Sequence, residues 1–138
     1  MALPLKVRAQ EAFAFLGHRG FTLQPPPQSD RLESDLSWQF EYRSQSVTVR
    51  VLFDMHQFEV GFHAHATHAS YQFIDREVYG RRSGFYGDMF GPDKIVAAID
   101  QIATDVQANY GIVLSGDPAL WAKIAKLKAV PAEKPRLP

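Results

Sequence analysis

The sequence predicts an α+β domain in which an antiparallel sheet of three to five strands is covered by helices on one face. Residues 36–62 alternate between apolar and polar side chains, which is typical of strands with one buried face. The segments before and after them carry apolar residues at three- and four-residue steps, the spacing of a helix with one buried face. We therefore expect the order helix, strands, helix, helix.

Composition and charge restrict the class of protein. The 138 residues are 46% hydrophobic and 22% charged, so one ordinary globular core can form without metal or disulfide support. Fifteen basic residues balance fifteen acidic ones, which argues against a general nucleic-acid-binding protein. The chain contains no cysteine, which excludes disulfides, thiolate metal ligands and a cysteine nucleophile.

The N-terminal segment and the lack of a long apolar run predict a cytoplasmic protein, bacterial in style. Lys6 and Arg8 interrupt what would be the apolar part of a signal peptide. No apolar run approaches the ~20 residues that a membrane helix needs, so we expect no membrane association.

Residues 1–129 are expected to form a single domain. Residues 130–138 contain three prolines and are expected to form a disordered tail.

The first helix is predicted from Leu5 to Leu16, and Gly17 is a natural stop signal at its end. A short strand is expected at 21–23, before three successive prolines at 25–27 that cannot join a sheet. The apolar stripe of the helix consists of Leu5, Ala9, Ala12, Phe13 and Leu16.

Three strands are predicted at 36–42, 47–53 and 58–62, because each of these segments alternates strictly. Their short connectors join antiparallel neighbours, which predicts a meander. Residues 71–79 are expected to add a fourth strand, although their alternation is less regular.

Two helices are predicted to close the domain. The longer one runs from Pro92 to Tyr110 and is ended by Gly111, and Asp117 is the expected N-cap of the last helix. The buried stripe of the longer helix consists of Ile95, Ile99, Ile102, Val106 and Tyr110.

The alternation also predicts a strand register and a polar sheet face. If Phe53 pairs with Phe58, then His63 lies opposite Thr48. Thr48 would in turn lie opposite Glu41, two strand spacings, or roughly 10 Å, from His63. These polar side chains are expected on the face that the helices leave uncovered.

A cluster of histidines provides a candidate metal site. His63 and His65 are two residues apart and are expected on the same, wet strand face, with His68 close by. The run resembles the metal motif of the cupins over six residues, but the carboxylate that follows in that motif is missing. A small enzyme using zinc or iron, with Asp75 or Glu77 as a further ligand or base, is therefore one hypothesis. The alternative is an ordinary polar strand that ends in a loop.

The glycine-rich segment 80–91 is predicted to be a loop that combines arginines with aromatic residues. Such a combination is typical of protein interfaces and of single-stranded nucleic-acid sites, although the neutral net charge makes the second use less favoured. Alternatively, its phenylalanines fold back into the core. The residues concerned are Arg81, Arg82, Phe85, Tyr86 and Phe90.

The acidic residues show no pair with a neighbouring base that would indicate a catalytic site. Asp75, Glu77, Asp100 and Asp105 are each expected on an ordinary solvated surface. No Gly-x-Ser-x-Gly context for a nucleophile is present. We therefore predict no catalytic residues.

Three segments resemble the immunity-type proteins of bacterial toxin systems. These are residues 15–21, the meander from 38 to 62, and residues 114–117 followed by Trp121 and Ile124. The resemblance implies a leading helix, a sheet and a final helix, and a protein that acts by binding without catalysis. The neutral net charge departs from the acidic character of an inhibitor of a basic nuclease, so the toxin partner stays open.

The function predicted from these patterns is that of a non-enzymatic binding protein, without a cofactor, whose partner is another protein. The metal-dependent enzyme is the alternative, and the partner's identity and the oligomeric state stay open. The expected contact residues lie on the wet sheet face and in the 80–91 loop: Gln39, Glu41, Arg50, His63, His65, Arg81, Arg82, Phe85, Tyr86 and Phe90.

Overall fold

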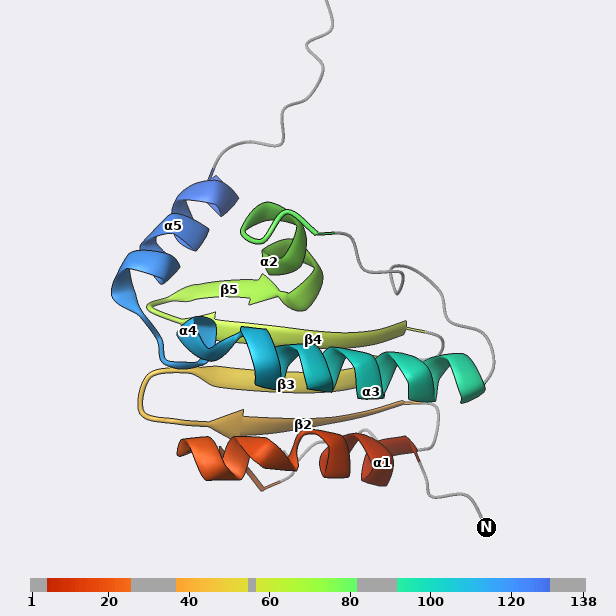
Figure 1. Ribbon diagram of the computed structural model, residues 1–138. Coiled ribbons are helices and arrows are strands. Elements are labelled where there is room, and N and C mark those ends of the chain that lie inside the picture. The colour runs from red at the N-terminus through yellow and green to blue at the C-terminus, as the bar shows by residue number, and fades with distance from the viewer. Residues whose placement is uncertain (1–4, 26–36, 55–56, 82–91, 130–138) are drawn as a thin grey trace, which may run out of the picture.

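The computed structural model describes residues 5–25, 37–54, 57–81 and 92–129. It confirms an α+β fold, with a five-stranded antiparallel sheet in the order β1-β2-β3-β4-β5 and helices at both ends of the chain. Helices α1 and α3 lie on the same side of the sheet, α1 along β2 and α3 across β3 and β4, whereas α2 and α5 lie near β5 (Figure 1). None of the described helices is both long enough and apolar enough to span a membrane.

The strands bury alternate residues against the helices, as the sequence predicts. On the buried face, Trp38, Phe53 and Phe58 pack with ring centroids 5.7 to 6.3 Å apart. The strand bounds are β1 Thr22–Leu23, β2 Ser37–Arg43, β3 Thr48–Asp54, β4 Gln57–Ala64 and β5 Thr67–Ser70.

The predicted register is correct between β3 and β4 and wrong between β2 and β3. Phe53 pairs with Phe58 and Thr48 with His63, as expected. Thr48, however, lies opposite Arg43, and Glu41 lies opposite Arg50. The reason is a tight turn in which the Ser44 backbone N–H donates to the Val47 carbonyl at 2.8 Å, and the Val47 N–H donates to Ser44 Oγ at 3.0 Å.

The first helix ends earlier than its apolar stripe predicts. Helix α1 covers Leu5–Ala12, and a 3₁₀ helix, η1, continues over Ala14–Arg19. Gly17 is therefore inside a helical turn, and Gly20, at φ +87°, ends it by donating its N–H to the Leu16 carbonyl. A change to the tighter 3₁₀ geometry still buries part of the predicted stripe, namely Ala9, Phe13 and Leu16.

Residues 71–79, predicted as a fourth strand, form a helix instead, and a different segment supplies the additional strand. Strand β5 returns after a two-residue turn at His65 and Ala66, which have φ angles of +52° and +63°. Ser70 then caps helix α2, Tyr71–Glu77, by accepting a hydrogen bond from the Phe73 N–H at 3.1 Å.

The C-terminal half follows the prediction closely. Helix α3 covers Pro92–Asn109, a single turn α4 covers Gly111–Leu114, and α5 covers Pro118–Ala129. The Leu120 N–H donates to Asp117 Oδ2 at 2.9 Å, which confirms the predicted cap. The predicted stripe of α3, namely Ile95, Ile99, Ile102, Val106 and Tyr110, is buried.

Gly116 fixes the C-terminal helices to the sheet. Its φ of +72° favours glycine, and a Cβ there would lie 2.7 Å from Ser46 Oγ and 3.1 Å from Val47 Cγ2. The α4–α5 connection therefore packs directly on the β2–β3 turn. The predicted tail at 130–138 and residues 82–91 of the predicted loop lie outside the described residues.

Candidate functional site

The sheet face that points away from α1 and α3 carries its side chains in straight rows across the strands. We call this surface the open face. Strand pairing aligns residues directly opposite one another, so each row runs across β2, β3 and β4, and the two longest rows reach β5. Its rows are Arg43–Thr48–His63–His68, Glu41–Arg50–Gly61–Ser70, Gln39–Leu52–Glu59 and Ser37–Asp54–Gln57.

Charge changes sign from one end of the open face to the other. The row with Asp54 and the row with Glu59 carry only acidic charge. The other two rows carry Arg43 and Arg50 against the single carboxylate of Glu41, together with two histidines. A surface polarised in this way can orient a charged partner on it.

One carboxylate holds both arginines of the basic end. Arg50 donates from Nε to Glu41 Oε2 at 2.9 Å, and Arg43 Nη2 lies 3.3 Å from Glu41 Oε1. The arginine side chains are 49% and 58% exposed, respectively, whereas Glu41 is 21% exposed. Ion pairs this exposed contribute little to folding stability, so their positive charge is available to a partner.

A glycine in the second row creates a hollow at this basic end. Gly61 has no side chain, and the imidazole of His68 lies over it, because a Cβ on Gly61 would be 3.1 Å from His68 Nε2. The resulting cavity has a volume of about 230 Å³, and we call it the basic hollow. Its lining residues are Glu41, Arg43, Thr48, Arg50, Gly61, Phe62, His63 and His68.

The basic hollow keeps His68 uncharged at neutral pH. Burial lowers the pKa of His68 below its usual value, and the positive charges of Lys128 and Arg50 lower it further. Glu59 acts in the opposite direction but does not reverse the shift. The hollow is therefore a place where added positive charge is disfavoured.

A second, larger cavity lies beside the basic hollow, toward β1 and α1. It has a volume of about 610 Å³ and shares Glu41, Arg43 and Arg50 with the basic hollow. The side chains of Lys6 and Gln10 on α1 line its other side.

The sequence-predicted contact residues fall into separate places. Gln39, Glu41, Arg50 and His63 share the open face, as expected. The prediction that His65 shares the face of His63 is wrong, because His65 lies in the β4–β5 turn. There its Nε2 is 2.8 Å from the Gly116 carbonyl oxygen.

Arg81 is the one further predicted contact residue that the structure describes, and it is not part of this surface. Arg81 contacts the helices on the opposite side of the sheet. The other predicted loop residues, Arg82, Phe85, Tyr86 and Phe90, lie outside the described residues.

The three-histidine arrangement expected for zinc or iron is not formed. His63 and His68 face each other across β4 and β5, but His65 points to Gly116. Asp75, the proposed further ligand, is buried beside Arg81. Across the described segments, no three histidine or carboxylate side chains converge in a geometry that could hold a metal ion.

The structure also contains a polar cluster between α2 and α3 that the sequence analysis did not predict. Asp75 is 1% exposed, and Arg81 Nη2 lies 2.6 Å from its Oδ1. Arg81 also donates to both oxygens of Asp105, at 3.1 and 2.8 Å. The prediction of ordinary surface positions for Asp75 and Asp105 is therefore wrong. We call the group the Arg81 cluster, and it comprises Tyr71, Asp75, Tyr79, Arg81, Asp105, Asn109 and Tyr110.

Hydrogen bonds saturate the second carboxylate of this cluster. Asp105 accepts from Tyr71 Oη at 2.7 Å and from Asn109 Nδ2 at 2.6 Å, in addition to Arg81. Burial alone would raise the pKa of Asp105, but the bonds from Tyr71, Arg81 and Asn109 outweigh it and hold the pKa below its usual value. Asp105 is therefore ionised, and its carboxylate oxygens accept hydrogen bonds from Tyr71, Arg81 and Asn109.

Three tyrosines enclose the Arg81 cluster. The rings of Tyr71 and Tyr79 lie 5.3 and 5.1 Å from that of Tyr110, and the Arg81 guanidinium lies 5.4 Å from the Tyr79 ring centre. Burial raises the pKa of all three tyrosines, so they are neutral at physiological pH. The helical spacing of Tyr71 and Asp75, four residues apart, was the signal in the sequence that could have indicated this shared site.

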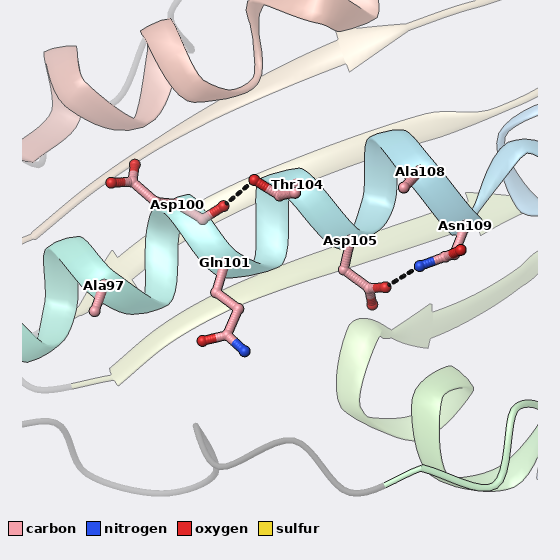
Figure 2. Close-up of a pocket in the computed structure, with 7 residues that line it drawn as sticks. All are labelled: Ala97, Asp100, Gln101, Thr104, Asp105, Ala108 and Asn109. Atoms are coloured by element: carbon pink, nitrogen blue, oxygen red, sulfur yellow. Dashed lines mark hydrogen bonds between the residues drawn. The ribbon is translucent and has the colours of Figure 1, made fainter.

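The outer face of α3 carries a further, open cavity of about 510 Å³. In Figure 2, Asp100 and Asp105 leave this helix on different flanks, Asp100 toward α1 and Asp105 toward α2. Asp100 binds Arg8 of α1 at 3.1 Å. Both carboxylates therefore connect α3 to its neighbours, and the other residues lining the surface are small or neutral: Ala97, Gln101, Thr104, Ala108 and Asn109.

No protein-family model matches the chain, and no curated protein or solved structure is significantly similar to it. The geometry of the open face and of the Arg81 cluster is therefore the basis for any statement on function.

Proposed function

We propose that this chain is a non-enzymatic binding protein whose partner, another protein, docks on the open face of the sheet. The observation that carries the proposal is the pair of exposed arginines beside the basic hollow, on a face that none of the described helices covers. Arginine is enriched at protein interfaces, where it commonly anchors the bound partner.

The Arg81 cluster supports a binding role over a catalytic one. It is the most buried group of charges in the described segments, and such groups are the usual place to look for chemistry. Here Arg81 and Asp105 are held by several contacts each, and Asp75 is held by Arg81. The cluster therefore stabilises the α2–α3 packing and presents no group poised for proton transfer.

The more specific form of this proposal is an inhibitor of the toxin-immunity type. The leading helix, sheet and closing helix agree with the arrangement that such a resemblance implies. Inhibition would be steric and electrostatic, with the arginines of the open face as anchors and no bond made or broken. The basic end of the face fits an acidic surface on the toxin.

An affinity experiment with matched variants tests the docking surface. The wild-type protein, Arg50→Glu and Lys123→Glu are used as baits in lysate of the cells that encode the protein, and captured proteins are compared by quantitative mass spectrometry. Lys123 is exposed on α5 and lines neither the basic hollow nor the larger cavity beside it. We expect a protein that wild type and Lys123→Glu both capture and that Arg50→Glu loses.

The same experiment can contradict the proposal. Equal recovery of every captured protein by Arg50→Glu would exclude the open face as the docking surface. Recovery of no protein above background by the wild type would count against a protein partner altogether. A thermal melt of each bait beforehand shows that the variants are folded.

A further inference from the structure

We propose that the partner inserts a carboxylate side chain into the basic hollow, so that the docking surface recognises an acidic protein segment. This inference rests on the proposed function, since it names the chemistry of the partner at the same face. It is carried by the placement of hydrogen-bond donors, by the balance of charge around the hollow, and by the charges that act on His68.

Donors from four neighbouring strands meet at the basic hollow. Arg43, Thr48, His63 and His68 form one row, which spans three strand spacings, roughly 14 Å. Arg50 stands in the adjacent row, beside Gly61, over which the His68 imidazole lies. These five residues all line the basic hollow, so an anion in it can reach guanidinium, hydroxyl and imidazole groups on different strands.

The arginines keep donor capacity after binding Glu41. Their contacts with Glu41 use Nε and Nη2 of Arg50 and Nη2 of Arg43. A guanidinium has five N–H donors in a planar fork that matches a carboxylate. A second carboxylate can therefore bind without displacing the first.

The charge around the hollow fits a single negative charge. Two arginines against Glu41 leave one positive charge among the residues that line the hollow, and the charges of Lys128 and Glu59, which also act on His68, are opposite to each other. A carboxylate balances this charge. A phosphate, which carries a charge of about −1.5 to −2 at neutral pH, would leave an excess of negative charge beside Glu41. The acidic rows with Glu59 and Asp54 would repel the partner from the far end of the face and so fix its orientation.

A metal cation at the His63–His68 pair is disfavoured by the same surroundings. The charged groups acting on His68 come from several elements: Lys128 on α5, Arg50 on β3, and Glu59 and His63 on β4. Their sum, together with burial, opposes a positive charge on the ring. Burial, the largest of these effects, opposes any added charge, whereas the positive charges of Lys128 and Arg50 oppose a metal ion and favour an anion.

Anion binding at this place depends on pH in a defined direction. A bound carboxylate favours the protonated imidazole, whereas the free protein holds the His68 pKa below about 6.5. Affinity for an acidic ligand is therefore expected to rise as the pH falls through the range in which His68 takes up a proton. The loss of His68 by substitution with glutamine should weaken this pH dependence.

The test uses a capped hexaglutamate peptide as the probe and a capped hexaglutamine peptide of the same length as its control. Binding to the full chain is followed by NMR of the imidazole and guanidinium resonances. We expect saturable shifts at His63, His68 and Arg50 with hexaglutamate only, weakened by added sodium chloride. Arg50→Gln should reduce affinity about tenfold, and Lys123→Gln should leave it unchanged.

Further arms of the experiment separate the alternatives. Inorganic phosphate is added as a competitor, and tighter binding of phosphate than of hexaglutamate would overturn the carboxylate assignment. Zinc chloride is added to a separate sample, and zinc-induced shifts at His63 and His68 at equimolar metal would overturn the anion site. Absence of shifts at the hollow with hexaglutamate would overturn it as well.

Failure of this inference can be distinguished from failure of the proposed function. If Arg50→Glu loses the captured partner but hexaglutamate shifts no resonance of the hollow, the open face remains the docking surface and only the acidic anchor is wrong. If Arg50→Glu keeps every captured protein, the docking surface itself is wrong, whatever the peptide does.

Discussion

Two ion-pair groups in this fold use the same chemistry in opposite arrangements. On the open face, the single carboxylate of Glu41 is shared by Arg43 and Arg50. In the Arg81 cluster, the single guanidinium of Arg81 is shared by two carboxylates, those of Asp75 and Asp105. The first group has an excess of positive charge and the second an excess of negative charge.

Burial decides what each arrangement can do. The side chains of Asp75 and Asp105 are 2% and 14% exposed, and both bind Arg81. The arginines of the open face are about half exposed, beside a cavity. A buried charge must be paired or it destabilises the fold strongly, whereas an exposed pair has little effect on stability. The Arg81 cluster therefore fixes structure, and the open face is available for binding.

The largest effect is expected from removing the shared guanidinium. Arg81→Met removes a cation that lies 2.6 Å from the buried carboxylate of Asp75. We expect the free energy of unfolding to fall by about 3 kcal/mol, the lower end for a broken buried pair, because Arg81 is itself partly exposed. Urea denaturation followed by circular dichroism measures this. A loss below about 1 kcal/mol would show that the cluster does not act as a buried charge network.

A smaller, pH-dependent effect is expected at the second carboxylate. Asp105→Asn should lower stability at neutral pH by about 2 kcal/mol, since charged hydrogen bonds become neutral ones. The pKa of Asp105 is lower in the folded than in the unfolded state, so its contribution is fully present above the unfolded value of about 3.8 and is lost as pH falls through the folded value.

The measurement for this prediction is unfolding of wild type and Asp105→Asn at a series of pH values. The difference between the two proteins should shrink as the pH is lowered below about 4. A difference that stays constant over the whole range would exclude the ionised carboxylate as its origin.

The β4–β5 hairpin, which positions His63 opposite His68, is expected to be improved by a substitution. Ala66 has a φ of +63°, a conformation that costs a residue with a Cβ about 1 kcal/mol. Ala66→Gly removes this cost but adds backbone entropy to the unfolded chain, so we expect a net gain below about 1 kcal/mol. Thermal unfolding measures it, and a clear loss of stability would mean that the Ala66 methyl group makes a packing contact that outweighs the strain.

The same hairpin shows where sequence patterns stop being informative. The strands from Ser37 to Phe62 were predictable because alternation reports burial directly, and α3 was predictable for the same reason. The turn at His65 and Ala66 lacks the glycine, asparagine or aspartate that usually permits positive φ angles, so nothing in the sequence marked the end of β4. Strand β5 was therefore missed.

Missing the hairpin also led to the wrong assignment of α2 and of His65. The residues after the turn were assigned to a strand, although Ser70 offered an N-cap and Tyr71 and Ile74 are buried at helical spacing. The open-face residues Gln39, Glu41 and Arg50 were found because alternation alone places them. In the Arg81 cluster, the spacing of Tyr71 and Asp75 could have indicated a shared helix face. Asp105 is 34 positions from Tyr71 and 24 from Arg81, and no local pattern reports such contacts.

The smallest effect on stability is expected at the open face. This prediction gives the clearest contrast between the open face and the Arg81 cluster. Arg50→Gln removes one exposed partner of Glu41, which keeps Arg43, so the free energy of unfolding should change by less than about 1 kcal/mol. The same substitution is expected to weaken binding of an acidic ligand. A large loss of stability here would mean that the charges of the open face hold the sheet together, as those of the Arg81 cluster hold α2 to α3, and that they are not available to a partner.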